Sequence, residues 1–246
     1  MGAKARVAWV FALAVAAGLA GQTLLLAERH CSRLETSMRD DFRVVLFLRA
    51  PLEKGRVKVL EEKLRAASEV ADVRFVSADD ALAALKRGDP ELAESVALVA
   101  DNPLPAAFEV RPTPQALTHL GAWLDGVQRL ADWSDVRYKS SQLQAILRLR
   151  FYAHVLSVTL NALLCLAAGL TLAALAGAER VSSAGLRLAF WAGLGGAFGS
   201  ILATAVAWPL RRDELLWALP AVPAQLALLA VCAMLGWSLS LWRAES

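Results

Sequence analysis

Few residues of the 246-residue chain have types and spacing that could carry out catalysis. The three histidines, His30, His119 and His154, lie far apart in the sequence. No Cys or His pair has zinc-site spacing, and neither the Gly-x-x-x-x-Gly-Lys-Ser/Thr phosphate loop nor the Gly-x-Ser-x-Gly elbow of hydrolases occurs. The sequence therefore predicts no ATP hydrolysis by this chain, no other enzymatic activity, no cofactor and no metal.

The remaining reactive side chains also favour structural roles. The paired acids adjoin predicted helices or caps, where solvated or N-terminal carboxylates are expected: Asp40-Asp41, Glu61-Glu62 and Asp79-Asp80. The three cysteines are Cys31, Cys165 and Cys232, so no two of them lie in the polar segment described below and no disulfide framework is predicted.

An uneven distribution of charge along the chain indicates the elements that would position these residues. The chain is 57% hydrophobic and 20% charged, and four stretches carry no charge at all: 7–27, 151–178, 188–210 and 215–242. About 20 residues at 1.5 Å rise cross a bilayer core of about 30 Å, so each stretch predicts a transmembrane helix. A single soluble globule is excluded.

The segment 28–150 has the composition of a water-soluble domain. It holds 19 of the 26 Lys and Arg residues and 19 of the 23 Asp and Glu residues, and is therefore neutral. No basic run is concentrated anywhere, which argues against a nucleic-acid partner.

The flanking charges predict which side of the membrane this segment occupies. Lys4 and Arg6 precede the first span and favour a cytoplasmic N-terminus, which places 28–150 outside. The two arginines of the predicted outer loop 211–214 weigh against this orientation. A cleaved signal peptide is the alternative for the first span, but its 21 uncharged residues favour an uncleaved anchor.

The outer segment repeats one pattern of elements. Residues 44–48 are apolar on both faces, as in a central strand, and an amphipathic helix follows from Val57 to Ala67 before an alternating strand at 72–77. A strand at 108–111, a helix capped by Thr113-Pro114 and a strand at 135–140 repeat this order. Two such βαβ units predict an α+β, ferredoxin-like (split βαβ) sheet with helices on one face.

An insertion at 78–105 separates the two units and predicts a two-helix lobe. Ser77 and Asp80 resemble a capping box, and Asp89-Pro90 starts the second helix. The apolar side chains of the lobe either pack on the sheet and each other, or remain partly exposed for a partner: Leu82, Leu85, Leu92, Val96 and Val99.

The end of the lobe carries a specific resemblance. Asn102-Pro103-Leu104-Pro105, followed by two alanines and Phe108-Glu109-Val110, resembles the FtsX family of bacterial cell-division membrane proteins. Residues 73–82 and the predicted order of one span, an outer domain and three spans are also similar to that family. The two prolines fix φ and hold their preceding residues extended, so this loop, with Asn102 and Phe108, is interpreted as structural.

The resemblance implies a function and partners. It implies a multi-pass protein of the bacterial inner membrane at the division site, similar to an ABC-transporter permease that transports nothing. Such a protein pairs with a cytoplasmic FtsE-type ATPase and relays ATP-driven conformational change to peptidoglycan hydrolases or their activators outside. A homodimer in the membrane is also expected.

One departure from the family leaves alternatives open. The loop 179–187, which carries Glu179, Arg180 and Arg187 and is expected to face the ATPase, is shorter than in family members. An adaptor that recruits cell-wall enzymes without an ATPase, or a small-molecule ABC permease, are the alternatives. The span 188–210 contains Gly195 and Gly199, whose spacing suits close packing of spans or a dimer seam.

The predicted organisation can be given in residue ranges. It consists of a cytoplasmic tail at 1–6, spans at 7–27, 151–178, 188–210 and 215–242, the outer domain at 28–150, loops at 179–187 inside and 211–214 outside, and a cytoplasmic tail at 243–246.

Overall fold

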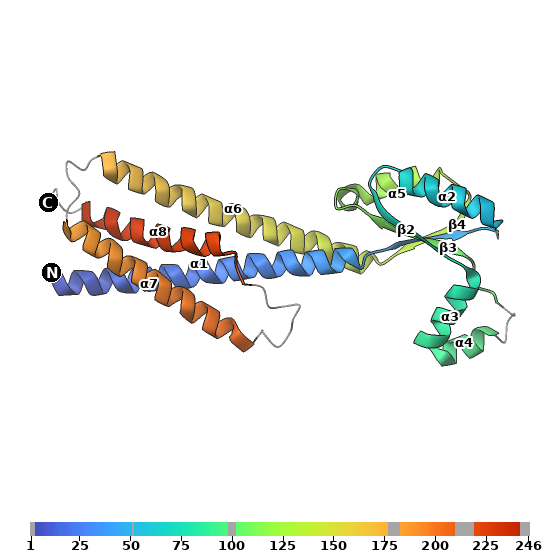
Figure 1. The fold of residues 1–246 in the computed structure, drawn as a ribbon, viewed down its shortest axis with the longest axis horizontal. Coiled ribbons are helices and arrows are strands. Elements are labelled where there is room, and N and C mark those ends of the chain that lie inside the picture. The colour runs from blue at the N-terminus through green and yellow to red at the C-terminus, as the bar shows by residue number, and fades with distance from the viewer. Residues whose placement is uncertain (1–2, 51, 98–101, 177–182, 210–218, 242–246) are drawn as a thin grey trace. The chain divides into compact units, whose positions relative to one another are not determined.

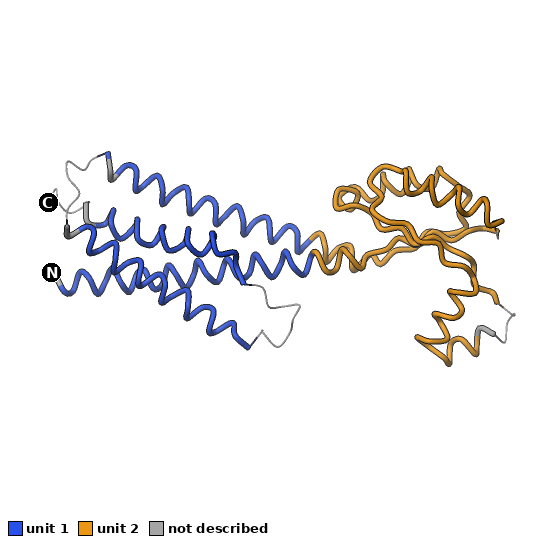
Figure 2. Tube along the Cα trace, in the orientation of Figure 1, with its two compact units in different colours: residues 1–35, 148–246 blue, residues 36–147 orange. Residues whose placement is uncertain are grey.

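The computed structural model describes residues 3–50, 52–97, 102–176, 183–209 and 219–241. Figure 1 shows the helices and strands in chain order. They form two compact units, drawn in different colours in Figure 2. Unit 1 comprises residues 1–35 and 148–246, and unit 2 comprises residues 36–147.

Unit 1 is built from four long apolar helices. They are α1 (Ala3–Asp40), α6 (Ser140–Ala176), α7 (Ser183–Ala207) and α8 (Val222–Leu241), with the ends of α1 and α6 continuing into unit 2. Each of the four is long and apolar enough to cross a membrane. Even the shortest, at 20 residues, reaches about 30 Å.

Glycines let α7 lie directly against α1 within the chain. A Cβ atom on Gly195 would lie 2.7 Å from the carbonyl oxygen of Phe11, and one on Gly199 would overlap the carbonyl oxygen of Val15. Gly196 lies against α8 in the same way, because a Cβ added there would lie 2.8 Å from the sulfur of Cys232. Of the two roles open to Gly195 and Gly199, packing of spans is therefore the one the geometry supports.

A polar contact accompanies this close packing. Gln22 of α1 is only 2% exposed, and its Nε2 donates a hydrogen bond to Thr204 Oγ1 of α7 at 3.2 Å. The Thr204 hydroxyl in turn donates to the carbonyl oxygen of Ser200 at 2.9 Å. Hydrogen bonds between helices stabilise membrane bundles modestly, by about 0.6 kcal/mol on average.

Unit 2 contains a four-stranded antiparallel sheet and helices. The strands are β1 (Val44–Leu48), β2 (Val70–Val76), β3 (Ala107–Pro112) and β4 (Trp133–Tyr138). Their order is β2-β3-β1-β4, and each neighbouring pair is antiparallel. The predicted α+β class of the domain is thus confirmed.

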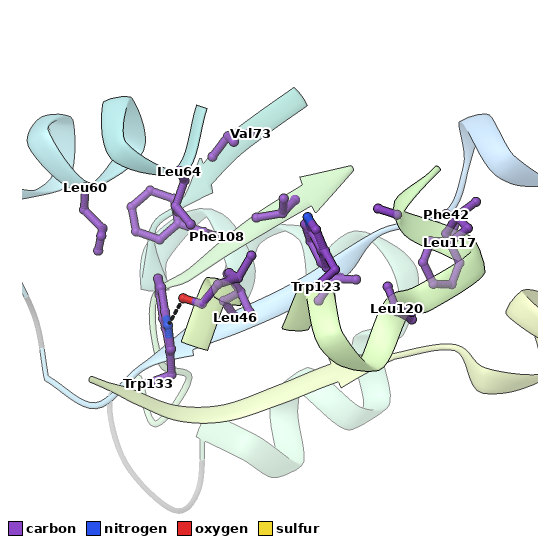
Figure 3. Packing of buried hydrophobic residues seen from close by; sticks show 14 of the residues in the cluster. Phe42, Leu46, Leu60, Leu64, Val73, Phe108, Leu117, Leu120, Trp123 and Trp133 are labelled. Atoms are coloured by element: carbon purple, nitrogen blue, oxygen red, sulfur yellow. Dashed lines mark hydrogen bonds between the residues drawn. The ribbon is translucent and has the colours of Figure 1, made fainter. Parts of the chain in front are cut away.

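One face of the sheet carries the core. In the central rows Leu46 lies opposite Phe108 and Val136, and Val73 lies opposite Val110. The helix α2 (Lys54–Ala66), the 3₁₀ helix η1 (Ala116–His119) and α5 (Leu120–Gln128) supply the other side of this core. Figure 3 shows the packed side chains, which include Leu60, Leu64, Leu117, Leu120 and Trp123.

The opposite face of the sheet is mixed, because Val45 and Phe47 of β1 lie there beside charged residues of the neighbouring strands. Arg74 lies opposite Glu109, and Asp72 lies opposite Arg111, so unlike charges face each other across β2 and β3. Such cross-strand pairs favour this register over one shifted by a residue, which would turn the charges into the core.

The segment after Thr113 differs in detail from the predicted helix. The chain first forms η1 and only then the regular α5. Thr113 Oγ1 accepts a hydrogen bond from the Ala116 amide at 3.5 Å, so the predicted cap serves a tighter turn than an α-helix. Ala116 and Leu117 are both buried, and this turn brings them into the core.

The ends of α1 and α6 belong to unit 2 and pack against its sheet. Phe42 and Ile146 are buried in the same core cluster, with Met38 and Leu143 packed against it. Gln142 Nε2 donates a hydrogen bond to the Met38 carbonyl oxygen at 2.8 Å, which joins α6 to α1. The two helix ends are therefore fixed to each other and to the domain.

The α1–α7 contact makes a direct prediction about stability. Gly199→Val would place its Cβ against backbone atoms of Val15 and Leu19, which cannot move without separating the helices. We expect a clearly lower melting temperature for the purified full-length protein in detergent.

Gly169→Val is the matched control, because it makes the same change within α6 where nothing lies within 4 Å of the added Cβ. Both variants replace a glycine inside a helix by valine, so the change in intrinsic helix propensity is matched. Equal melting temperatures for the two variants would contradict close α1–α7 packing.

Candidate partner-binding lobe

The lobe begins with a capped helix. The helix α3 spans Ala78–Gly88, and Ser77 Oγ accepts a hydrogen bond from the Asp80 amide at 3.1 Å. The Ser77 hydroxyl also donates to Asp80 Oδ2 at 2.7 Å. Asp79 and Asp80 lie in the first turn, where negative charge interacts favourably with the helix dipole.

The second helix of the lobe, α4, is fixed in a similar way. It spans Pro90–Ala97, and Asp89 Oδ1 accepts a hydrogen bond from the Leu92 amide at 3.0 Å. Proline at the first helical position loses no hydrogen bond, because that amide has no partner within a helix. Ala93 is buried, and α4 lies in contact with α3.

The apolar side chains of the lobe are only partly covered. Leu82 and Leu85 of α3 are half-buried, and no residue of α3 is fully buried. Leu92 of α4 is 49% exposed. Val96 lies in α4 but its side chain is outside the described part of the chain, as is Val99 altogether.

The return from the lobe is tied to its start. Asn102 Nδ2 donates a hydrogen bond to Asp79 Oδ1 at 3.3 Å, and Asn102 Oδ1 accepts one from the Leu104 amide at 3.2 Å. The loop continues through Pro103, Leu104 and Pro105, and the Ala106 carbonyl oxygen accepts a hydrogen bond from the Leu48 amide at 2.9 Å. Asn102 thus links the first turn of α3 to the strand that follows.

Phe108 anchors this loop in the core. Its side chain is 0% exposed, and its ring lies 5.1 Å from the Phe75 ring and 6.1 Å from the Trp133 ring, centroid to centroid. Trp133 Nε1 donates a hydrogen bond to the Val127 carbonyl oxygen at 3.2 Å, the dashed line in Figure 3. The Asn-Pro-Leu-Pro loop is therefore held at both ends.

The residues expected to face an ATPase are described only in part. Arg187 lies in α7 and is exposed. Glu179 and Arg180 lie outside the described residues.

His30 and His119 each contact a hydrogen-bonding group of the protein. His30 Nδ1 lies 2.9 Å from the Leu26 carbonyl oxygen of its own helix. His119 Nε2 lies 2.8 Å from Glu69 Oε2, and Glu69 has a positive φ of 63°. The Thr113 amide donates to the Glu69 carbonyl oxygen at 2.8 Å, so His119 and Thr113 together stabilise this strained turn before β2.

A perturbed carboxyl lies on the face of the sheet opposite the core. Asp135 Oδ2 accepts a hydrogen bond from Arg137 Nε at 2.6 Å, and Asp135 Oδ1 accepts one from the Val136 amide. These bonds, the one from Arg137 first, hold the pKa of Asp135 below its usual range. Its contribution to stability is therefore present above the unfolded-state pKa and is lost as the pH falls through the lowered value.

The described part of the chain contains no cluster of three His, Cys, Asp or Glu side chains that could hold a metal ion. The shifted carboxyl of Asp135 is explained by a local ion pair on an exposed strand, which is a structural arrangement.

Together, four membrane-length helices and an α+β domain between the first two define a membrane protein with one extramembrane domain. Residues 41–150 match the family model described as the FtsX extracellular domain. This match confirms the resemblance inferred from the Asn-Pro-Leu-Pro loop and identifies residues 41–150 as an FtsX extracellular domain. No curated protein matched the chain.

The family assignment also gives the general class of function. The FtsX family is a non-enzymatic, permease-like component of bacterial cell division. The chain is accordingly a cell-division membrane protein that resembles an ABC-transporter permease.

Asp79 and Gln142 are two positioning residues that the sequence did not single out as such. The sequence pattern indicates only an N-terminal carboxylate at Asp79, whereas Asp79 also receives the hydrogen bond from Asn102, 23 residues later. Gln142 has no detectable signal, because its partner is a backbone carbonyl 104 residues away. Contacts of such sequence separation are invisible to local patterns.

The Asn102–Asp79 contact predicts a coupled effect on lobe stability. We expect Asn102→Ala and Asp79→Ala each to speed amide hydrogen exchange in residues 78–97 of the full-length protein, and the double variant to add little. The sheet residues 107–112 serve as the internal control. Fully additive effects would contradict a direct interaction between the two side chains.

Proposed function

We propose that the protein relays conformational change across the bacterial inner membrane at the division site, from a cytoplasmic FtsE-type ATPase to peptidoglycan hydrolases or their activators outside. The observation that carries this proposal is the continuity of α1 and α6. Each helix runs without a break from the membrane-length bundle into the soluble unit, where Met38 of α1 packs against the domain core and Ile146 of α6 is buried in it.

The proposed topology places unit 2 outside the cytoplasm. Lys4 and Arg6 on the N-terminal side of the first span support this orientation. Four spans would then return the C-terminus, with Arg243, to the cytoplasm, and a homodimer would complete the permease-like assembly.

We further propose that unit 2 has a ferredoxin-like fold into which the lobe is inserted. The order β2-β3-β1-β4 and the two β-α-β segments support the classification. The lobe helices α3 and α4 lie between β2 and β3, at the junction of the two segments.

The mechanism we propose is a population shift. ATP binding by the partner can change the outer domain only if the ATPase binds the two arrangements of the spans with different affinity. A shift from 1:99 to 99:1 requires about 5.5 kcal/mol of such difference. Two continuous helices anchored at Met38 and Ile146 would carry the motion of the spans into the domain.

The proposed readout surface is the apolar part of the lobe. Leu82, Leu85 and Leu92 keep part of their surface accessible, and Val96 and Val99 extend the same predicted stripe. Partly exposed leucines on two short helices suit an amphipathic partner segment.

A second candidate is an adaptor that recruits wall enzymes without an ATPase. It is favoured by the short cytoplasmic connection, since α6 ends at Ala176 and α7 begins at Ser183. The two candidates share the lobe and differ only in the cytoplasmic partner.

The lobe surface can be tested by charge insertion. We expect Leu85→Glu and Leu92→Glu to weaken binding of hydrolases or their activators to the full-length protein by about tenfold or more, the loss typical of a central interface residue. Pull-down with the detergent-solubilised protein provides the measurement.

Val59→Glu in α2 is the matched control, because Val59 is likewise an exposed apolar helix residue, at 54%, outside the lobe. All variants should insert into the membrane normally. Equal binding by the lobe variants and the control would reject this surface.

The two candidate functions are separated by purification from membranes in mild detergent. We expect a stoichiometric ATPase to accompany the protein, and Arg187→Glu to reduce its recovery because that exposed charge lies at the cytoplasmic start of α7 in the proposed topology. Purification without any ATPase, with wall enzymes still bound, would favour the adaptor. ATP-dependent solute flux in vesicles would instead favour a permease.

A further inference from the structure

We propose that a cavity among α1, α6 and α8 binds the chain of a single amphiphilic lipid whose headgroup carries an ammonium group. The cavity has a volume of about 430 Å³ and is lined by residues from Ala17 to Glu28, from Ser157 to Leu170 and from Ala224 to Leu235. All of these residues belong to unit 1. The proposal does not depend on the relay function.

The size of the cavity is that of a small-molecule site. A volume of 430 Å³ lies in the range of about 300–1,000 Å³ that is typical of small-molecule sites.

The cavity also continues along the bundle. A second cavity of about 380 Å³ shares Ala17, Leu170, Cys232 and Leu235 with the first and extends to Val10 and Leu239. From Val10 to Glu28 α1 rises about 27 Å, close to the thickness of a bilayer core. An extended lipid chain could occupy this path from one end.

The polarity of the lining is that of an amphiphile. Three of its residues are polar, and they gather at one end: Glu28 comes last along α1, whereas Ser157 and Asn161 come early along α6, which runs in the opposite direction (Figure 1). Every other lining residue is Ala, Gly, Leu, Val or Cys. A hydrogen-bonding headgroup would lie at the polar end of the cavity, and the acyl chain would lie along its apolar remainder.

The charge of Glu28 selects the headgroup. Its side chain is only 25% exposed, and the Arg29 Nε atom lies 3.9 Å from its Oε2, which is longer than a hydrogen bond. This ion pair leaves the carboxylate oxygens of Glu28 able to accept a shorter hydrogen bond, so an ammonium group of the ligand would be bound here. Arg29, whose side chain is 45% exposed, would accommodate the lipid phosphate.

The test compares two phospholipids with the same acyl chains. The full-length protein in detergent is incubated with micelles containing phosphatidylethanolamine or phosphatidylglycerol, and retained lipid is measured by native mass spectrometry. We expect one phosphatidylethanolamine per chain and about tenfold less phosphatidylglycerol, the preference expected of a charge-assisted hydrogen bond. Glu28→Gln should remove this preference.

A second pair of variants tests the cavity itself. Ala227→Phe fills the cavity and should abolish lipid retention, whereas Ala230→Phe makes the same change on an exposed position of α8 that lines neither cavity. Melting temperatures identify any variant that fails to fold, and Glu28→Gln remains decisive in that case.

Three results would overturn the proposal. They are equal retention of the two lipids by the unmodified protein, unchanged preference in Glu28→Gln, and equal lipid retention by Ala227→Phe and Ala230→Phe. A lipid-free dimer that Ala227→Phe dissociates would assign the cavity to a second copy instead.

Discussion

The whole arrangement depends on how two helix ends are held by one small sheet. The chain passes between its two units only at residues 35–36 and 147–148, and both crossings lie inside continuous helices. On the domain side, Phe42 and Ile146 are buried and Gln142 bonds the Met38 carbonyl oxygen. Both helix ends are therefore fixed within the domain by buried contacts and by this interhelix bond.

The elements of the fold could be read from the sequence because their signals are local. Uncharged stretches indicate the four apolar helices, and the apolar run at residues 44–48 predicts a strand with the bounds that β1 has. Neither the 3₁₀ start at Ala116 nor the extension of β2 back to Val70 follows from the local pattern. Both adjoin contacts of the turn at Glu69, which is held by Thr113 and His119 from a distant part of the chain.

In the lobe, too, local contacts can be predicted from the sequence and the packing of helices cannot. Its caps at Ser77 and Asp89 are contacts over three residues and are visible in the sequence. Whether Leu82, Leu85 and Leu92 are covered depends on how α3 and α4 pack, and helical spacing alone leaves both possibilities open. The answer is intermediate: Ala93 supplies the buried contact, and the leucines keep accessible surface.

Both the proposed relay and the proposed lipid site involve α6. The part of α6 within unit 1 leaves most of its leucines exposed, whereas α7 is packed closely through glycine. A helix with few protein contacts costs little to move, and this suits a span that transmits motion. A lipid bound beside it would stabilise one position of α6 over another in proportion to its difference in affinity, so membrane composition would bias the equilibrium on which the relay acts.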